Sequence, residues 1–394
     1  MQKVLRGKAW VLVAMGVVVS AGGLQVGDSG LASARAAGTP SAAVTPPAEG
    51  LISPELLDHA RLKPLWQQRL PVKEGESFPL MTLLGDRLYI RSSLNYLWAL
   101  DRVKGSIVFS RSIAPAGIPM LGLTAYDNRL ITVIGNQLVE LDQDTGAERR
   151  VSDLELSIIA PVVRNNQFFY VSAADRRLHA LRAKDLVQIF EVAAEDDSLI
   201  TTVTADDALV AFGTDAGDLI AIQPNAPRKL WQFKVPEAIS GPVLRDSDAF
   251  YFASVDTNVY RIDATSTTTS TLGWKCQTEA ALDCPPVVTA GFVYQYAPGR
   301  GLTAIPKQAG KPAWRLPEGV DLLAEVGGQA YVVTKLGTLA VMDNATGHKL
   351  YAVNFAPVAY HATNTMDARI YIADKAGRVV CLEPARGLAV GAGR

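Results

Sequence analysis

Short apolar segments recur along this chain at a nearly constant interval. The second segment of each copy begins in turn at Leu88, Leu130, Phe168, Leu209, Phe250, Phe292, Ala330 and Ile370, with spacings of 38 to 42 residues. A third segment follows a short turn, as at 97–101 and 138–142, and its large aliphatic residues alternate with more variable ones. Alternation with period two predicts β-strands, and a fixed repeat of about 40 residues predicts a propeller or a solenoid.

Each copy has room for four short strands, which is the content of one β-propeller blade. The last copy stops after its third strand, whereas an unpaired segment at 64–68 precedes the first copy. That segment carries Trp66 and is similar to the fourth segments that carry Trp231, Trp274 and Trp314. We therefore predict an all-β, eight-bladed propeller with four antiparallel strands per blade, closed by the N-terminal strand. Seven blades is the main alternative.

The N-terminal segment is typical of export. Basic residues precede an apolar stretch at 9–19, and Ala-x-Ala sites follow at 32–34 and 34–36. This order predicts a signal peptide over 1–36, with an uncleaved membrane anchor as the alternative. An Ala- and Pro-rich linker over 37–50 follows.

A short helix is expected within 51–63, because Ser53-Pro54-Glu55 combines a capping serine with proline at the first helical position. The propeller is expected over 64–386 and a flexible tail over 387–394.

Three turns carry a recognisable motif. They read Ala99-Leu100-Asp101 with Lys104-Gly105, Leu141-Asp142 with Thr145-Gly146, and Met342-Asp343 with Thr346-Gly347. Each aspartate can accept hydrogen bonds from the turn amides, and each glycine can supply a left-handed backbone. The motif resembles the PQQ-like repeat of quinoprotein-type propellers. The resemblance implies that Trp66, Trp231, Trp274 and Trp314 pack between neighbouring blades.

Composition and motifs exclude some classes of function. Apolar residues make up 48% of the chain, and the formal net charge is -1, which argues against a nucleic-acid-binding protein. The resemblance keeps a PQQ-dependent dehydrogenase, or a propeller that binds PQQ or another small ligand, as an alternative. The adjacent cysteines and long insertions usual in such enzymes are missing from this sequence. We predict no catalytic, cofactor-binding or metal-binding residues and no cofactor.

The cysteines and histidines suggest structural roles. Cys276 and Cys284 are predicted to form a disulfide in an exported chain, with two free thiols as the alternative. Cys381 is expected to be a small buried apolar residue. His179 is expected to face outward, and His361 lies at the entry to a first strand.

Acidic residues gather in the connections from each fourth strand to the next first strand. The seven connections after residue 111 contain no lysine or arginine and ten acids, namely Asp153, Glu155, Glu195, Asp196, Asp197, Glu237, Glu279, Asp283, Glu318 and Asp321. The opposite face has basic turns with Arg102, Lys104, Arg182, Lys184, Arg228, Lys229, Lys307 and Lys311. An acidic ring around the channel mouth predicts a protein partner that presents a basic segment.

These features together predict a periplasmic or otherwise exported, monomeric, non-catalytic protein-binding scaffold of the cell envelope. The chain resembles BamB-type propellers of outer-membrane protein assembly in length and repeat. It departs from them in having no acceptor cysteine for a lipid, and in reading Glu195-Asp196-Asp197 where that family presents apolar and basic contacts. No contact with nucleic acid is expected, and membrane contact is expected only through an uncleaved signal segment.

Overall fold

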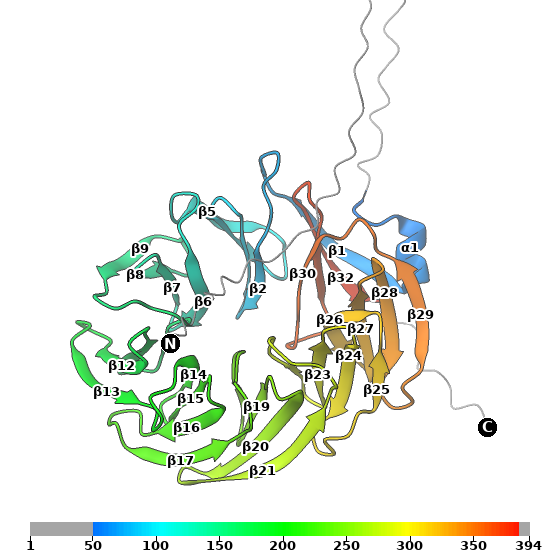
Figure 1. Ribbon diagram of the computed structural model, residues 1–394. Helices are drawn as coiled ribbons and strands as arrows, with labels where there is room; N and C mark the ends of the chain where they lie inside the picture. The colour runs from blue at the N-terminus through cyan, green and yellow to red at the C-terminus, as the bar shows by residue number, and fades with distance from the viewer. Residues whose placement is uncertain (1–49, 386–394) are drawn as a thin grey trace, which may run out of the picture. The chain divides into compact units, whose positions relative to one another are not determined.

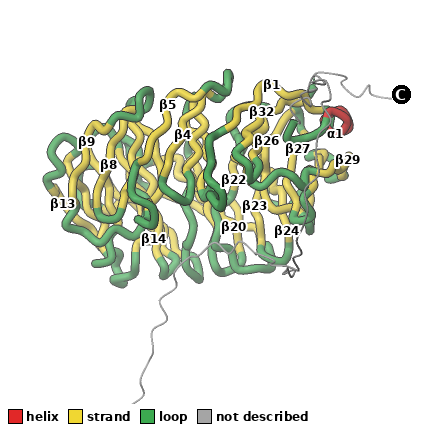
Figure 2. Tube along the Cα trace, turned by 90° about the horizontal axis from the view of Figure 1, so that it is seen from above, coloured by secondary structure: helices red, strands yellow, loops and turns green. Residues whose placement is uncertain are grey.

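The computed structural model describes residues 50–385, which form eight four-stranded antiparallel sheets arranged in a ring (Figure 1). The predicted signal peptide, most of the linker and the C-terminal tail lie outside the described residues. Seen from the edge, the sheets stand side by side around the ring (Figure 2). The eight-bladed all-β prediction is confirmed.

The strands follow one another blade by blade. Blade 1 contains β2 (Leu80–Leu84), β3 (Arg87–Arg91), β4 (Tyr96–Asp101) and β5 (Ile107–Ser112). Blade 2 contains β6 (Met120–Tyr126), β7 (Arg129–Ile134), β8 (Gln137–Asp142) and β9 (Glu148–Asp153). Blade 3 contains β10 (Val163–Arg164), β11 (Phe168–Ser172), β12 (Arg177–Arg182) and β13 (Gln188–Ala193). Blade 4 contains β14 (Ile200–Ala205), β15 (Val210–Thr214), β16 (Asp218–Ile222) and β17 (Lys229–Lys234).

The second half of the ring repeats this order. Blade 5 contains β18 (Leu244–Asp246), β19 (Ala249–Ala253), β20 (Asn258–Ser266) and β21 (Thr269–Gln277). Blade 6 contains β22 (Val287–Val288), β23 (Phe292–Ala297), β24 (Gly301–Pro306) and β25 (Trp314–Leu316). Blade 7 contains β26 (Gly319–Val326), β27 (Gln329–Thr334), β28 (Thr338–Asp343) and β29 (Lys349–Asn354). Blade 8 contains β30 (Tyr360–Ala362), β31 (Ile370–Ala373), β32 (Arg378–Pro384) and β1 (Leu62–Arg69).

The N-terminal strand closes the ring. β1 pairs antiparallel with β32, from Leu62 opposite Pro384 to Arg69 opposite Arg378. This pairing completes blade 8 with a strand from the other end of the described chain, as predicted. Radial packing of eight small sheets leaves only short strand edges, which limits the exposed-edge problem of open sheets.

The helix predicted near Ser53 is α1 (Pro54–His59). The Ser53 side chain accepts a hydrogen bond from the Leu56 N–H at 3.4 Å, and proline occupies the first turn. Leu57 packs into the apolar core that blades 7 and 8 share. The helix thus packs against the outer strands of blades 7 and 8, next to the strand that closes the ring.

The turn motif has the expected geometry. Asp101 Oδ1 accepts from the N–H groups of Val103 and Lys104 at 2.9 and 2.8 Å, and Gly105 has φ +73°. Asp142 with Gly146, and Asp343 with Gly347, repeat the same bonds and the same left-handed glycine. The positive φ explains why glycine stands at the end of each of these turns.

An aromatic ring of one blade lies over the turn glycine of the next blade. A Cβ added to Gly105 would lie 2.4 Å from the Trp66 ring, so only glycine fits beneath the indole. Two further pairs show the same 2.4 Å approach, namely Phe109 over Gly146 and Trp274 over Gly310. Trp314 lies less tightly over Gly347, where an added Cβ would lie 3.1 Å from Trp314 Cβ and 3.8 Å from the indole ring. Trp66 Nε1 also donates to the Arg102 carbonyl oxygen at 3.1 Å. These contacts join neighbouring blades at four junctions of the ring, namely blades 8 and 1, 1 and 2, 5 and 6, and 6 and 7.

Trp231 is the exception among the four tryptophans. It packs edge-on against Phe250 of blade 5, with ring centroids 5.4 Å apart. The turn between β20 and β21 contains no glycine, and Trp231 Nε1 is buried without a hydrogen-bond partner among the described residues. Trp231 therefore still packs against the neighbouring blade, but its indole N–H makes no hydrogen bond to that blade.

Candidate functional site

The connections between blades form one face of the ring, which we call the connection face. It is made by the segments from each fourth strand to the next first strand, together with the turns between second and third strands. The structure adds an eighth connection, residues 70–79, which carries Lys73, Glu74 and Glu76. Two of the predicted acids lie within strands rather than loops, because Asp153 ends β9 and Asp321 belongs to β26.

Basic side chains from neighbouring elements compensate much of the predicted acidity. Asp197 pairs with Arg176 at 3.1 Å, and Glu279 pairs with Arg315 at 3.2 Å. Further partners are Lys229 for Glu195, Lys234 for Asp196 and Lys349 for Glu318. The Lys349 side chain lowers the pKa of Glu318, which keeps this carboxylate ionised. The connection face is therefore less negative than its loops alone indicate.

Four of the ten acids have no ion-pair partner within residues 50–385. They are Asp153, Glu155, Glu237 and Asp283, and all four are exposed. Asp153 accepts only a neutral hydrogen bond, from Gln137 Nε2 at 2.9 Å. These four carboxylates are the part of the acidic face that stays available to a partner.

An apolar hollow of about 350 Å³ lies next to Cys284, and residues of blades 6, 7 and 8 line it. The first strand of each blade stands nearest the centre of the ring (Figure 1). Tyr294, Tyr296 and Leu302 supply apolar walls. In one corner Asp321 Oδ2 lies 3.0 Å from His361 Nε2 and accepts a hydrogen bond from Thr363 Oγ1 at 3.1 Å. The hollow thus combines apolar walls with one polar anchor.

Cys284 also lines the hollow, as a free and partly buried thiol. Burial, with smaller contributions from Asp283 and Asp321, raises the pKa of this thiol to about 11. A cysteine nucleophile needs the opposite shift, because the thiolate is the reactive form. The environment of Cys284 therefore favours packing over covalent catalysis.

The predicted disulfide between Cys276 and Cys284 is not formed in the structure, where both thiols are free. Cys276 is buried in the core between blades 5 and 6, whereas Cys284 Sγ lies 3.6 Å from the Tyr296 carbonyl oxygen. Cys381 is completely buried, as expected for an apolar strand residue.

The expectation for His179 is wrong. Its side chain is only 3% exposed, because β13 and the preceding turn cover it. His179 Nδ1 lies 3.0 Å from Gln188 Oε1, and Nε2 lies 2.9 Å from Asp175 Oδ2. Both ring nitrogens are therefore held by neighbouring side chains, which makes this histidine structural.

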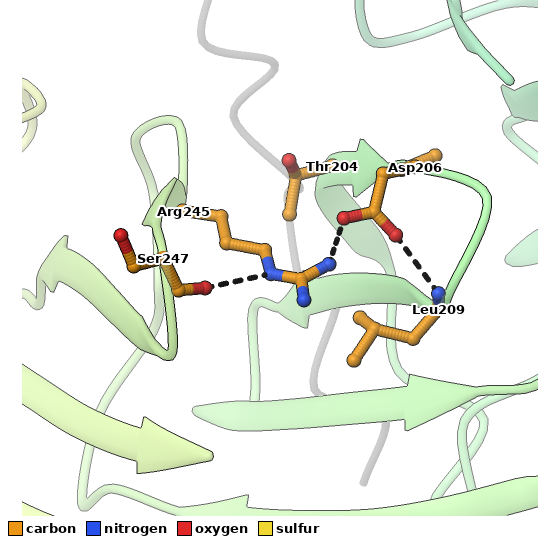
Figure 3. Close-up of a pocket in the computed structure, with 6 residues that line it drawn as sticks. Thr204, Asp206, Leu209, Arg245 and Ser247 are labelled. Carbon is orange, nitrogen blue, oxygen red and sulfur yellow. Dashed lines mark hydrogen bonds and ion pairs between the residues drawn. The ribbon is translucent and has the colours of Figure 1, made fainter. Parts of the chain in front are cut away.

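The opposite face carries pockets at the junctions between blades. The pocket between blades 4 and 5 has a volume of about 340 Å³ (Figure 3). Arg245 reaches across it to pair with Asp206, and Arg245 Nε donates to the Ser247 carbonyl oxygen at 3.3 Å. The Asp206 carboxylate also accepts from the N–H of Leu209 at 2.9 Å. The charges in this pocket therefore satisfy one another.

A second pocket of this face lies between blades 2 and 3, and it was not foreseen from the sequence. Arg129, Arg149, Arg150 and Arg164 line it together with Lys184. Only Lys184 belongs to the basic turns that the sequence placed on this face. The adjacent Arg149-Arg150 pair near the start of a fourth strand was the one feature of the sequence that could have indicated this cationic pocket.

We find no group of three or more His, Cys, Asp or Glu side chains placed to bind a metal ion within residues 50–385. None of the helical structure in that range has the length and apolarity that a membrane span requires.

A closed ring of eight four-stranded blades, with Asp/Gly turns and aromatic rings between blades, defines a PQQ-like propeller. The family model described as outer membrane protein assembly factor BamB matches residues 114–315 and 255–391, which together cover more than half of the chain. The chain belongs to this family.

Solved structures show the same fold at low identity. BamB from Moraxella catarrhalis is 17% identical, with a TM-score of 0.63 over 83% of this chain and 99% of that chain. The computationally designed Ika8 protein is 14% identical, with a TM-score of 0.61 over 78% of this chain and 96% of that chain. No curated protein matches the sequence.

Proposed function

We propose that this protein is a non-catalytic protein-binding scaffold of the cell envelope, acting in outer-membrane protein assembly or a related envelope complex. The observation that carries the proposal is membership of the BamB family across most of the propeller. A rigid ring with variable loops on one face also suits recognition, because loops on a rigid framework commonly supply binding residues.

We place the docking site on the connection face. Glu155 and Glu237 are exposed acids without a basic partner in residues 50–385, so a basic segment can pair with them at low desolvation cost. Leu336, in the turn after β27, is 69% exposed, the largest value among the exposed large apolar side chains of the described region. The apolar hollow next to Cys284 can accept one side chain of the partner. The expected partner thus presents basic residues next to an apolar one.

A charge-reversal pair tests this site. The double variant Glu155→Lys/Glu237→Lys reverses two unpaired acids of the connection face. The matched control Asp86→Lys/Asp248→Lys reverses two exposed acids in turns of the opposite face, with the same change in net charge. Partners are first captured by cross-linking in intact cells and identified, and binding of the purified partner is then measured at several salt concentrations.

We expect the connection-face variant to lose at least about tenfold in affinity and to show a weaker salt dependence, because rim charges act through screened Coulomb attraction. The control should bind like wild type. Equal binding by both variants would refute the docking site. An absorption spectrum of the same preparation tests the alternative, because a bound quinone would give a chromophore and would favour a PQQ-dependent enzyme.

A further inference from the structure

The pocket between blades 2 and 3 has a volume of about 460 Å³ and is unusually rich in guanidinium groups. Arg129 begins β7, Arg149 and Arg150 belong to β9, and Arg164 ends β10. Lys184, from the turn between β12 and β13, is the fifth cationic side chain of the lining. Five cations therefore converge from two blades on one cavity.

A buried carboxylate holds three of these arginines in place. Glu140 of β8 is completely buried. Its carboxylate pairs with Arg150, lies 2.9 Å from Arg129 Nη1, and lies 3.8 Å from Arg164 Nη1. A buried carboxylate without partners would be costly, so these contacts fix the guanidinium positions before any ligand binds.

Aromatic rings and a backbone carbonyl complete this support. The Arg164 guanidinium lies 4.4 Å from the Tyr126 ring centroid and 4.7 Å from that of Phe169. Arg150 also donates to the Ala183 carbonyl oxygen at 2.6 Å. The arginine side chains are therefore ordered by contacts that do not use all of their N–H donors.

The cations outnumber the acids around the cavity. Glu140 is shared by three arginines, Asp142 pairs with Arg149, and Asp127 is the only acid of the lining itself. Five cations against these three carboxylates leave two positive charges in excess. Lys184 is exposed, and its ammonium has no partner within residues 50–385. The cavity thus lacks about two negative charges.

The pocket between blades 4 and 5 provides an internal comparison. Arg164 and Arg245 occupy equivalent positions near the end of a first strand, and each lies over a phenylalanine ring of the following strand. Arg245 is neutralised by Asp206 across the junction (Figure 3). At the junction of blades 2 and 3 the same framework carries additional arginines instead. The positive excess of the pocket between blades 2 and 3 is therefore not shared by the equivalent pocket between blades 4 and 5.

We propose that the pocket between blades 2 and 3 binds a phosphate monoester group. Arginine forks match the oxygens of phosphate, and a phosphate monoester carries close to two negative charges at neutral pH, which equals the excess of the pocket. The group can come from a soluble phosphate compound or from a phosphorylated lipid headgroup. This proposal does not depend on the docking site of the connection face.

The direct test is calorimetric titration of the full chain with inorganic phosphate, with sodium chloride at equal ionic strength as the reference. The double variant Arg149→Gln/Lys184→Gln removes two exposed cations of the pocket and leaves the contacts of Glu140 intact. The matched control Arg177→Gln/Lys229→Gln removes two exposed cations from other sites. We expect saturable binding that weakens at least tenfold in the pocket variant and stays unchanged in the control.

Flotation with vesicles of phosphatidylcholine, with and without phosphatidic acid, separates the two sources. Phosphate binding without vesicle binding supports a soluble ligand, and vesicle binding that requires phosphatidic acid and is lost in the pocket variant supports a lipid headgroup. No binding in either assay, or equal loss in the pocket variant and its control, would overturn the proposal. Circular dichroism of each variant verifies that the propeller is folded.

Discussion

Replacing Gly105 by alanine tests the aromatic contact that joins blade 8 to blade 1. Gly105 has φ +73°, and a Cβ at this position would lie 2.4 Å from Trp66 Cδ2. Carbon atoms in contact normally lie about 3.5–4.0 Å apart, so the indole has to move. Its movement breaks the hydrogen bond from Trp66 Nε1 to the Arg102 carbonyl oxygen.

Gly299 is a matched control for the backbone strain that alanine introduces at a positive φ. It has the same φ of +73°, and an added Cβ would meet no heavy atom within 4 Å. Both alanine variants lose about 1–2 kcal/mol to left-handed strain, and both reduce the entropy of the unfolded chain equally. The Gly105 variant additionally loses about 1–3 kcal/mol to overpacking and about 1 kcal/mol with the hydrogen bond. We therefore expect it to be less stable than the Gly299 variant by about 2–4 kcal/mol.

The assay is equilibrium urea unfolding of the full chain, followed by far-ultraviolet circular dichroism. Tryptophan fluorescence is recorded alongside, because displacement of Trp66 should also change the emission of the native state. Comparison of the transition midpoints at equal slopes gives the difference in the free energy of unfolding. A difference below about 0.5 kcal/mol between the two variants would refute the packing argument.

Two further predictions concern the turns and the tryptophans. The Arg149 side chain, followed by Thr145, lowers the pKa of Asp142, so this carboxylate stabilises the fold above its unfolded pKa of about 3.9 and loses that effect as the pH falls through the folded value. Asp142→Asn should therefore lower the free energy of unfolding by about 1 kcal/mol at pH 7, and by progressively less below pH 4. Urea unfolding at a series of pH values measures this loss, and a loss that does not change with pH would contradict the reasoning. Trp314→Phe should destabilise the protein by at least about 1 kcal/mol more than Trp231→Phe, because Trp314 Nε1 donates to buried Asn344 Oδ1 at 3.0 Å whereas Trp231 Nε1 has no partner in the described region. Equal thermal midpoints for the two tryptophan variants would count against it.

Much of the fold was predictable because its signals are local. Strand alternation depends on residues two apart, and each turn depends on an aspartate and a glycine within five residues. The number of blades followed from counting these signals. Closure by β1 was predictable for a different reason, since Trp66 marks the N-terminal strand as a missing fourth strand although its partner Cys381 lies at the other end of the described chain.

The pairing of charged side chains could not be predicted from the sequence, because it depends on the tertiary structure. The sequence placed ten acids in the connection loops, and two of them, Asp153 and Asp321, belong to strands instead. Basic partners of the other acids, such as Lys349 for Glu318, come from strands that no local pattern connects to those loops. The burial of His179 was missed for the same reason, because Gln188 of the next strand covers it.

The pocket between blades 2 and 3 shows the limit of sequence reasoning most clearly. Glu140 and Arg164 belong to different blades and meet only when the two sheets pack side by side. Periodicity along the chain determines which residues form strands and which face the core, because neighbouring residues share one backbone geometry. Electrostatic interactions depend on distances in space between separate strands. The sequence by itself therefore determined the propeller, its phasing and its family resemblance, and only the tertiary structure decided which charges cancel and where a positive excess remains.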